Sequence, residues 1–168
     1  MTPSGINIVL CNILSADRIA LSIGERCRVM HYSLPLSFDQ VPRKTVLVLR
    51  PTIKDTLQDD RVSILKESIK ECSRRNIFVV LCTTPRFGGG PPASKIVNSS
   101  NLRCMEIAAR SDIGLFDLDL VLAHEGAGCF RGETDELSDA GITTVTGALR
   151  RALEEFSGRI PRENEIGG

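Results

Sequence analysis

The sequence predicts the α/β class, with a three-layer α/β/α sandwich built around a five-stranded parallel sheet. Short apolar runs alternate along the chain with segments whose apolar residues recur at helical spacing. The runs are apolar at consecutive positions, which is typical of parallel strands that are buried on both faces. This alternation predicts helices on both faces of one sheet, in the flavodoxin-like strand order 2-1-3-4-5. We expect a single domain over residues 1–157 and a flexible tail over residues 158–168.

Local signals justify the elements in chain order. Ser15 is positioned to cap a first helix, which Gly24 closes. The run TVLVL is continuous and β-branched, which predicts a central strand. Loops rich in turn residues are expected over residues 85–92 and over about 121–137. The predicted strands cover residues 6–13, 27–32, 45–49, 77–82 and 113–118, and the predicted helices cover residues 16–23, 58–74, 98–110 and a last segment that carries Ile142, Val145, Leu149, Ala152 and Phe156.

Composition and charge narrow the classes of function. Hydrophobic residues make up 42% of the 168 residues and charged residues 25%, as in ordinary globular proteins. Lys and Arg together number 21, as do Asp and Glu, so the net charge does not favour nucleic acid or an anionic membrane as a partner. Trp is absent and aromatic residues make up 4%, which argues against a platform for stacking RNA bases.

The cysteines and the ends of the chain bear on cofactors and location. Six cysteines without a CxxC spacing, and two histidines, offer no clustered metal ligands, so we expect neither a metal site nor a cofactor. We expect the cysteines to be buried free thiols in a reducing compartment. No apolar run approaches a membrane span, and the first residues lack the basic region of a signal peptide. We therefore expect an intracellular protein, cytoplasmic or nuclear, without membrane contact.

In a doubly wound sheet, ligands bind beyond the carboxyl ends of the strands. This places the candidate site at residues 12–15, 50–56, 83–90 and 117–137. There Arg50, Lys54 and Arg86 are expected to converge and to face acidic residues such as Asp55. Two interpretations stay open: solvated or paired charges that add little stability, or a polar groove that recognises a peptide, a nucleic acid phosphate or a small anion. The predicted groove residues are Ser15, Arg50, Thr52, Lys54, Thr84, Arg86, Glu133 and Glu136.

Several motifs in these segments occur in the order of a known family. They are Thr84-Pro85-Arg86-Phe87-Gly88 after an apolar strand, Asn101-Leu102 in the following helix, Asp117 at the end of Ile113-Gly114-Leu115-Phe116, and Glu136 before Gly141 and the last helix. The chain resembles the SGNH/GDSL hydrolase superfamily from Ile6 to Phe156. It is most similar to the esterase-type domain in the first open-reading-frame protein of some vertebrate non-LTR retrotransposons.

The resemblance implies acyl transfer by a serine after the first strand, with a histidine base and an aspartate three residues before it. The nucleophile position carries Leu14, or Ser15 if the turn is one residue longer. The base position carries Glu136, and the position that orients the base carries Glu133. A carboxylate of ordinary acidity is a poor base toward a serine hydroxyl at neutral pH. The catalytic pattern of the family is therefore degenerate in this chain.

The remaining signature positions also depart from the family. The oxyanion Asn of the family corresponds to Ile53 or Lys54, and no Gly follows the second predicted strand. His31 lies in or at the end of that strand, and His124 lies in the loop after Asp117, so neither takes the place of the missing base by position. The hydrophobic framework between these positions is retained. We interpret the chain as a pseudoenzyme, in which Ser15, His124 and Glu136 are only weak catalytic candidates.

Three functions follow from this interpretation. The favoured one is a catalytically inactive SGNH-like module for protein binding or assembly, with a protein partner or a second copy of the chain. The SGNH-like domain of the germ-plasm protein Oskar is a precedent for a lost triad. The second is an active serine esterase that uses a displaced Ser15 with His124 or Glu136, which requires the loop at 121–137 to fold back onto the first strand. The third is an RNA-binding component of a ribonucleoprotein, whose affinity falls steeply with salt.

Overall fold

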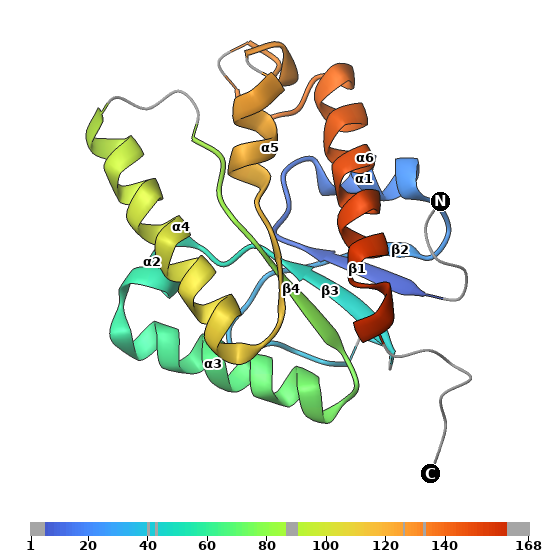
Figure 1. The fold of residues 1–168 in the computed structure, drawn as a ribbon, viewed down its shortest axis with the longest axis vertical. Helices are drawn as coiled ribbons and strands as arrows, with labels where there is room; N and C mark the ends of the chain where they lie inside the picture. Colours follow the sequence, from blue (N-terminus) through green and yellow to red (C-terminus); the bar gives the residue numbers. More distant parts are fainter. Residues whose placement is uncertain are drawn as a thin grey trace.

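The strands of the protein form one parallel sheet. The computed structural model describes residues 6–39, 41–42, 44–86, 91–125, 127–132 and 134–160. The strands are β1 (Asn7–Cys11), β2 (Cys27–Met30), β3 (Thr45–Leu49), β4 (Phe78–Cys82) and β5 (Gly114–Phe116). They pair in the order β2-β1-β3-β4-β5 (Figure 1), which confirms the order predicted from the sequence. All five residues of β3 are buried, as expected for a β-branched central strand that is covered on both faces.

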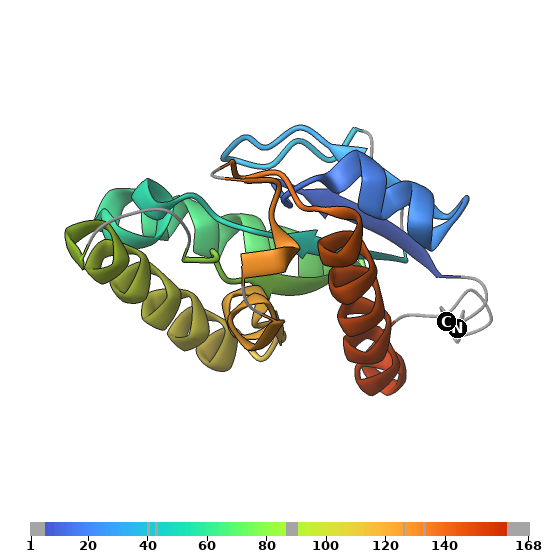
Figure 2. The same ribbon diagram turned by 90° about the horizontal axis from the view of Figure 1, so that it is seen from above.

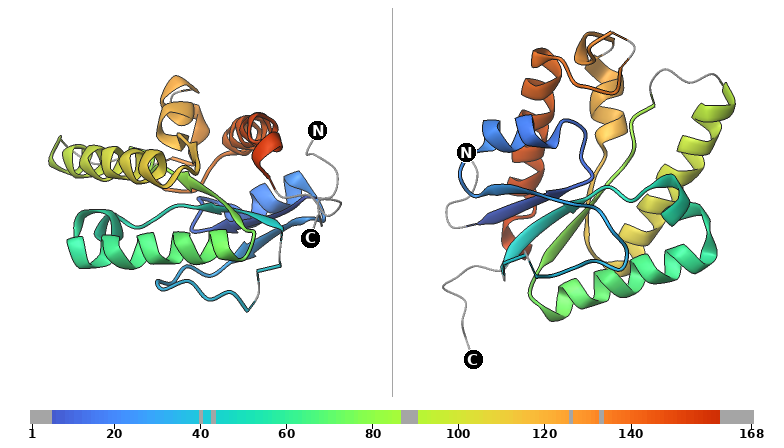
Figure 3. Two further views of the ribbon diagram at one scale, coloured as in Figure 1. Left: turned by 60° about the horizontal axis from the view of Figure 1, so that its bottom comes forward. Right: turned by 180° about the vertical axis from the view of Figure 1, so that it is seen from behind.

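Helices pack on the sheet in two groups (Figures 2 and 3). The helices are α1 (Ala16–Ile23), α2 (Ile53–Leu57), α3 (Asp59–Arg74), α4 (Pro91–Ser111), α5 (Leu118–Glu125) and α6 (Asp139–Glu155), with short 3-10 turns η1 (Ala127–Cys129) and η2 (Ser157–Arg159). One core cluster joins side chains of α1, α5 and α6 to the sheet, and a second joins side chains of α3 and α4 to it. The predicted three-layer arrangement is therefore confirmed.

The pairing of β1 with β3 positions the candidate site. The register runs from Asn7 opposite Thr45 to Cys11 opposite Leu49. The residue after β3, Arg50, continues this pairing, because its backbone N–H donates to the carbonyl of Cys11 at 3.1 Å. After this point, neither the segment that follows β1 nor the segment that follows β3 continues in the sheet. The segments that follow β1 and β3 therefore lie side by side at the carboxyl edge of the sheet.

The helices begin and end at points that periodicity did not reveal. Helix α4 begins at Pro91 rather than near 98, because proline needs no N–H partner in the first turn. Helix α5 occupies the start of the segment expected to be a loop, and Asp117 caps it by accepting from the N–H of Leu120 at 3.2 Å. The additional helix α2 is capped by Thr52, whose hydroxyl accepts from the N–H of Asp55 at 3.3 Å. These are short-range polar signals within expected loops.

The described residues end in the core. Ile160 is buried in the same cluster as the inner face of α6, so packing extends to that residue. Residues 161–168, which include most of the predicted tail, lie outside the described residues. None of the helices described is long and apolar enough to cross a membrane.

Candidate functional site

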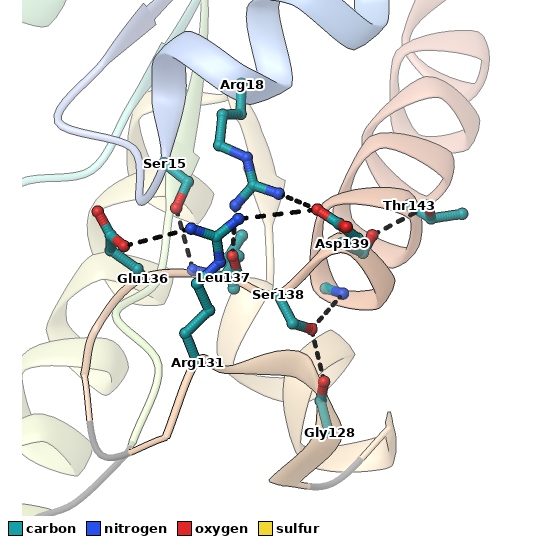
Figure 4. Close-up of polar contacts among 10 residues, drawn as sticks. Ser15, Arg18, Gly128, Arg131, Glu136, Leu137, Ser138, Asp139 and Thr143 are labelled. Carbon is teal, nitrogen blue, oxygen red and sulfur yellow. Dashed lines mark hydrogen bonds and ion pairs between the residues drawn. The ribbon is translucent and has the colours of Figure 1, made fainter.

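Ser15 lies at the carboxyl edge of the sheet, where β1 turns into α1. Asn12 and Ser15 both adopt left-handed backbone conformations, with φ of 61° and 50°, and together they turn the chain sharply. Leu14 points into the core, so it is Ser15 that faces the opposite loop. The sequence predicts that the Ser15 hydroxyl caps α1, but this hydroxyl makes no capping hydrogen bond to the helix. Instead, its Oγ accepts a hydrogen bond from the backbone N–H of Leu137 at 3.0 Å (Figure 4).

The segment before α6 folds back onto the start of α1. Arg18 donates to the carbonyl oxygen of Leu137 at 2.5 Å and also to the carboxylate of Asp139. Ser138 begins α6: its hydroxyl accepts from the N–H of Gly141 at 3.1 Å and donates to the carbonyl of Gly128 at 2.5 Å. The fold-back that the esterase hypothesis requires is thus present. It is held by backbone groups and by contacts that surround Ser15.

Gly141 makes this close approach of α6 to η1 sterically feasible. A Cβ atom at this position would lie 2.1 Å from the carbonyl oxygen of Cys129, far inside van der Waals contact. The approach brings Ser138 within reach of the 3-10 turn, and Ser138 N–H donates to that same Cys129 carbonyl at 2.8 Å. A glycine is therefore required here for packing rather than for its backbone angles.

No base is positioned next to Ser15 in the part of the chain that the structure describes. Glu136 is 66% exposed at its side chain, and its carboxylate pairs with Arg131 at 3.8 Å. His31 lies just after β2 and His124 lies on α5; both are exposed, and neither forms a hydrogen bond with Ser15. Glu133, the predicted orienting residue, lies outside the described residues. The described geometry therefore contains a serine but no imidazole beside it.

Arg50 lies between the ends of β1, β3 and β4. Its Nε donates to the carbonyl of Asn12 at 2.6 Å, and its two terminal nitrogens lie 3.4 Å from Asn12 Oδ1 and Thr84 Oγ1. The Asn12 amide donates back to the Arg50 carbonyl at 2.8 Å. Burial lowers the pKa of the Arg50 guanidinium, while the negative charge of Asp135 acts in the opposite direction. Arginine stays charged in either case, so this edge of the sheet carries a fixed positive charge.

Thr84 and Arg86 occupy the segment after β4. The side chain of Asn101 on α4 accepts from the Thr84 N–H and donates to the Thr84 carbonyl, both at 2.8 Å, which fixes this segment. Arg86 is turned toward α5, where its backbone N–H donates to Asp119 at 2.9 Å and its guanidinium pairs with the same carboxylate at 3.2 Å. Among the groove residues, the structure thus brings Arg50 and Thr84 together, whereas Arg86 is neutralised separately.

A buried acid lies in the middle of α2. Asp55, expected to face the cations of the groove, is only 3% exposed and instead pairs with Arg61 at 2.7 Å and accepts from the Tyr32 hydroxyl. Burial alone raises the pKa of Asp55, but hydrogen bonds from Tyr32 and Arg61 outweigh it, so the pKa lies below the ordinary value. Thr52 N–H also donates to the Tyr32 hydroxyl, at 3.3 Å. Lys54, the neighbour of Asp55 in α2, is exposed to solvent.

Sequence reasoning missed this network because its members are spread over the chain. Tyr32 and Asp55 are separated by 23 residues, and no local pattern marks them as partners. The only sequence signal was the spacing of Thr52 and Asp55, which is typical of a helix cap.

The cysteines do not contribute reactive groups to this edge. All six are free and buried. Burial raises the pKa of the Cys11 and Cys104 thiols to about 12, so both stay protonated and are weak nucleophiles at neutral pH. Over the described residues, no three His, Cys, Asp or Glu side chains are arranged to hold a metal ion.

This architecture is the fold of the SGNH/GDSL hydrolases. No protein-family model and no curated protein matches the sequence, but solved structures of this class superimpose on nearly the whole chain. A lipase/acylhydrolase from Enterococcus faecalis matches with a TM-score of 0.61 and 16% identity, over 94% of this chain and 98% of that one. A GDSL-like lipase from Bacteroides thetaiotaomicron matches with a TM-score of 0.63 and 13% identity, over 89% and 87%.

An acetyl xylan esterase from Geobacillus stearothermophilus has a TM-score of 0.67 at 10% identity, over 91% of this chain and 96% of that one. Catalytic mutants of that esterase, in which a serine or a histidine is replaced by alanine, also match. At these identities the likeness is one of fold, and the chemistry must be argued from the residues of this chain.

Proposed function

We propose that this chain is an SGNH-fold domain that does not hydrolyse esters and that serves as a module for binding another protein. The observation that carries the proposal is the environment of Ser15. Its hydroxyl accepts a backbone N–H from Leu137, and over the described residues no histidine contacts it. The equal numbers of acidic and basic residues and the low aromatic content favour a protein partner over RNA.

The chemistry of acyl transfer explains why this environment argues against hydrolysis. A serine hydroxyl attacks a carbonyl only when a neighbouring base takes its proton. Glu136, which occupies the base position of the family pattern, is exposed and paired with Arg131. A solvated carboxylate attracts a proton too weakly at neutral pH to serve as this base. Loss of the base alone removes several orders of magnitude in rate from enzymes of this type.

The test is hydrolysis of p-nitrophenyl acetate by the purified chain and by its Ser15→Ala variant. We expect both proteins to release nitrophenol at the same low rate, because the chain lacks a group that activates the serine. Circular dichroism of the variant shows whether its fold is retained. Hydrolysis that depends on Ser15 would overturn the proposal.

A serine acyl hydrolase is the second candidate, and one observation favours it. The segment that ends at Leu137 does fold back onto Ser15, which is the arrangement that a displaced nucleophile needs. The left-handed backbone of Ser15 is also the kind of strain that gathers at functional sites. The same assay decides between the two candidates, since only this one predicts turnover that disappears in Ser15→Ala.

The resemblance to the esterase-type domain of retrotransposon proteins belongs to the same proposal. It is supported by the order of motifs in the chain rather than by any superposition. An intracellular location, and self-association as one form of partner binding, are likewise proposed. Sedimentation measured over a range of protein concentrations tests self-association directly.

A further inference from the structure

We infer that Arg50 is a receptor for a carboxylate group of the binding partner. This inference rests on the proposed function and names the chemistry that the module recognises. Arg50 directly follows β3, next to the end of β1, at the point where the strand order reverses direction. Ligands of doubly wound folds bind at this switch point.

The guanidinium of Arg50 is held in place before any ligand arrives. Nε is fixed by the carbonyl of Asn12 at 2.6 Å, and the terminal nitrogens rest at 3.4 Å from Thr84 Oγ1 and Asn12 Oδ1. The first contact is strong and the other two are long, close to the limit for hydrogen bonds. Guanidinium carries five N–H donors. One N–H on each terminal nitrogen is therefore left without a described partner, and a guanidinium group matches the two oxygens of a carboxylate.

The positive charge of Arg50 is not neutralised at contact distance by any described carboxylate. All three of its hydrogen-bond acceptors are neutral oxygens. Two other arginines at this edge, Arg61 and Arg86, each pair with a carboxylate, at 2.7 and 3.2 Å. A partly buried cation without a counter-charge is costly, and an incoming anion offsets that cost. Arg50 thus differs from Arg61 and Arg86, because its charge is available to an anion from outside the chain.

The surrounding charges favour a single carboxylate over a phosphate chain. Asp135 acts electrostatically on Arg50. One guanidinium balances one negative charge, whereas the further charges of a dianion or a polyanion would be left unbalanced and would be repelled more strongly by Asp135. We therefore assign the site to an Asp, Glu or C-terminal carboxylate of a partner protein.

Titration of the purified chain with sodium acetate, followed by NMR at the Arg50 Nε–H resonance, tests this directly. Sodium chloride at matched ionic strength serves as the reference. We expect saturable shifts with acetate and with a short acetylated peptide that contains one Glu. Arg50→Gln should weaken acetate binding by about tenfold or more, as expected for loss of a charged hydrogen bond. Arg50→Lys, which keeps the charge but loses the fork, should bind with intermediate affinity.

Two further variants control for net charge and for folding. Arg74→Gln removes one positive charge from the end of α3, far from the site, and should leave acetate affinity unchanged. Asp135→Asn removes the competing negative charge and should tighten acetate binding, so the inference stays testable if Arg50→Gln does not fold. Equal acetate affinity in Arg50→Gln, or weaker affinity in Asp135→Asn, would overturn it. So would tighter binding of a ten-nucleotide uridine RNA than of the peptide, with steep salt dependence.

The outcomes also separate this inference from the proposed function. Hydrolysis that depends on Ser15, together with acetate binding at Arg50, would contradict the proposed non-hydrolytic function and would support the carboxylate site at Arg50. Absence of both hydrolysis and acetate binding would contradict the carboxylate site at Arg50. It would remain consistent with a non-hydrolytic module that recognises a different chemical group.

Discussion

The carboxyl edge of the sheet has two halves that hold their polar side chains differently. The half around the first helix, which we call the Ser15 half, consists of Ser15, Arg18, Arg131, Glu136 and Asp139. Its ion pairs are open to solvent, and the side chain of Asp139 is 94% exposed. The half around α2, which we call the Asp55 half, consists of Tyr32, Thr52, Asp55 and Arg61. Its central acid is 3% exposed; its carboxylate accepts hydrogen bonds from Tyr32 and Arg61, and its backbone N–H donates to the Thr52 hydroxyl.

The contrast shows that the buried hydrogen-bond network and the candidate nucleophile lie in different halves of this edge. The Asp55 half is ordered by a buried network, which joins the loop after β2 to α2 and α3. The Ser15 half contains Ser15, the predicted weak nucleophile candidate, and among the described residues exposed charges rather than a buried base surround it. An unsatisfied buried acid is far more costly than a broken exposed pair. We therefore expect the stability of the fold to depend more on the Asp55 half than on the Ser15 half.

The largest expected effect comes from the Asp55 half. Asp55→Asn should lower the free energy of unfolding by about 3 kcal/mol, because an amide cannot replace the carboxylate between Tyr32 and Arg61. Urea denaturation followed by circular dichroism measures this loss. A change within the error of the measurement would mean that the two halves do not differ in stability as described.

Acidification gives a second measure of the same network. The folded-state pKa of Asp55 lies below its ordinary value, so the folded state binds the proton more weakly than the unfolded state does. The contribution of Asp55 to stability is thus full above its unfolded pKa, near 4, and is lost as pH falls through its folded pKa. Between about pH 5 and pH 2 the wild-type chain should lose stability more steeply than Asp55→Asn. Parallel curves for the two proteins would count against the network.

The smallest effect is expected in the Ser15 half. Asp139→Asn breaks a solvent-exposed pair with Arg18, whose hydrogen bond to the Leu137 carbonyl remains. We expect no measurable change in the urea midpoint. A loss as large as that of Asp55→Asn would show that the exposed charges do hold the fold-back, and the comparison would fail.

Much of the fold could be read from local patterns. The apolar runs that became β3 and β4 predicted buried parallel strands, and the spacing of Val62, Leu65 and Ile69 predicted the buried face of α3. Parallel order and helix placement then follow from general rules of connection. The boundaries were less accurate, since α4 begins at Pro91 and α5 lies inside an expected loop. Caps and proline positions, rather than hydrophobicity, decide where those helices begin.

The site was predicted as a location and only in part as a set of contacts. Ser15 and Arg50 were expected at this edge, and they lie there. The pairing of Arg86 with Asp119 and of Asp55 with Tyr32 and Arg61 was not foreseen. Charged side chains reach several ångströms in many directions, so sequence position alone does not choose their partners.

The sequence by itself determined the class of fold and the edge where the polar residues gather, because both follow from hydrophobic periodicity and from the direction of the strands. Only the tertiary structure decided which polar groups meet. Ser15 and Leu137 are 122 residues apart, and Arg50 and Asn12 are 38 apart. Such contacts depend on how the helices pack on the sheet, a global property that no local stretch of sequence encodes.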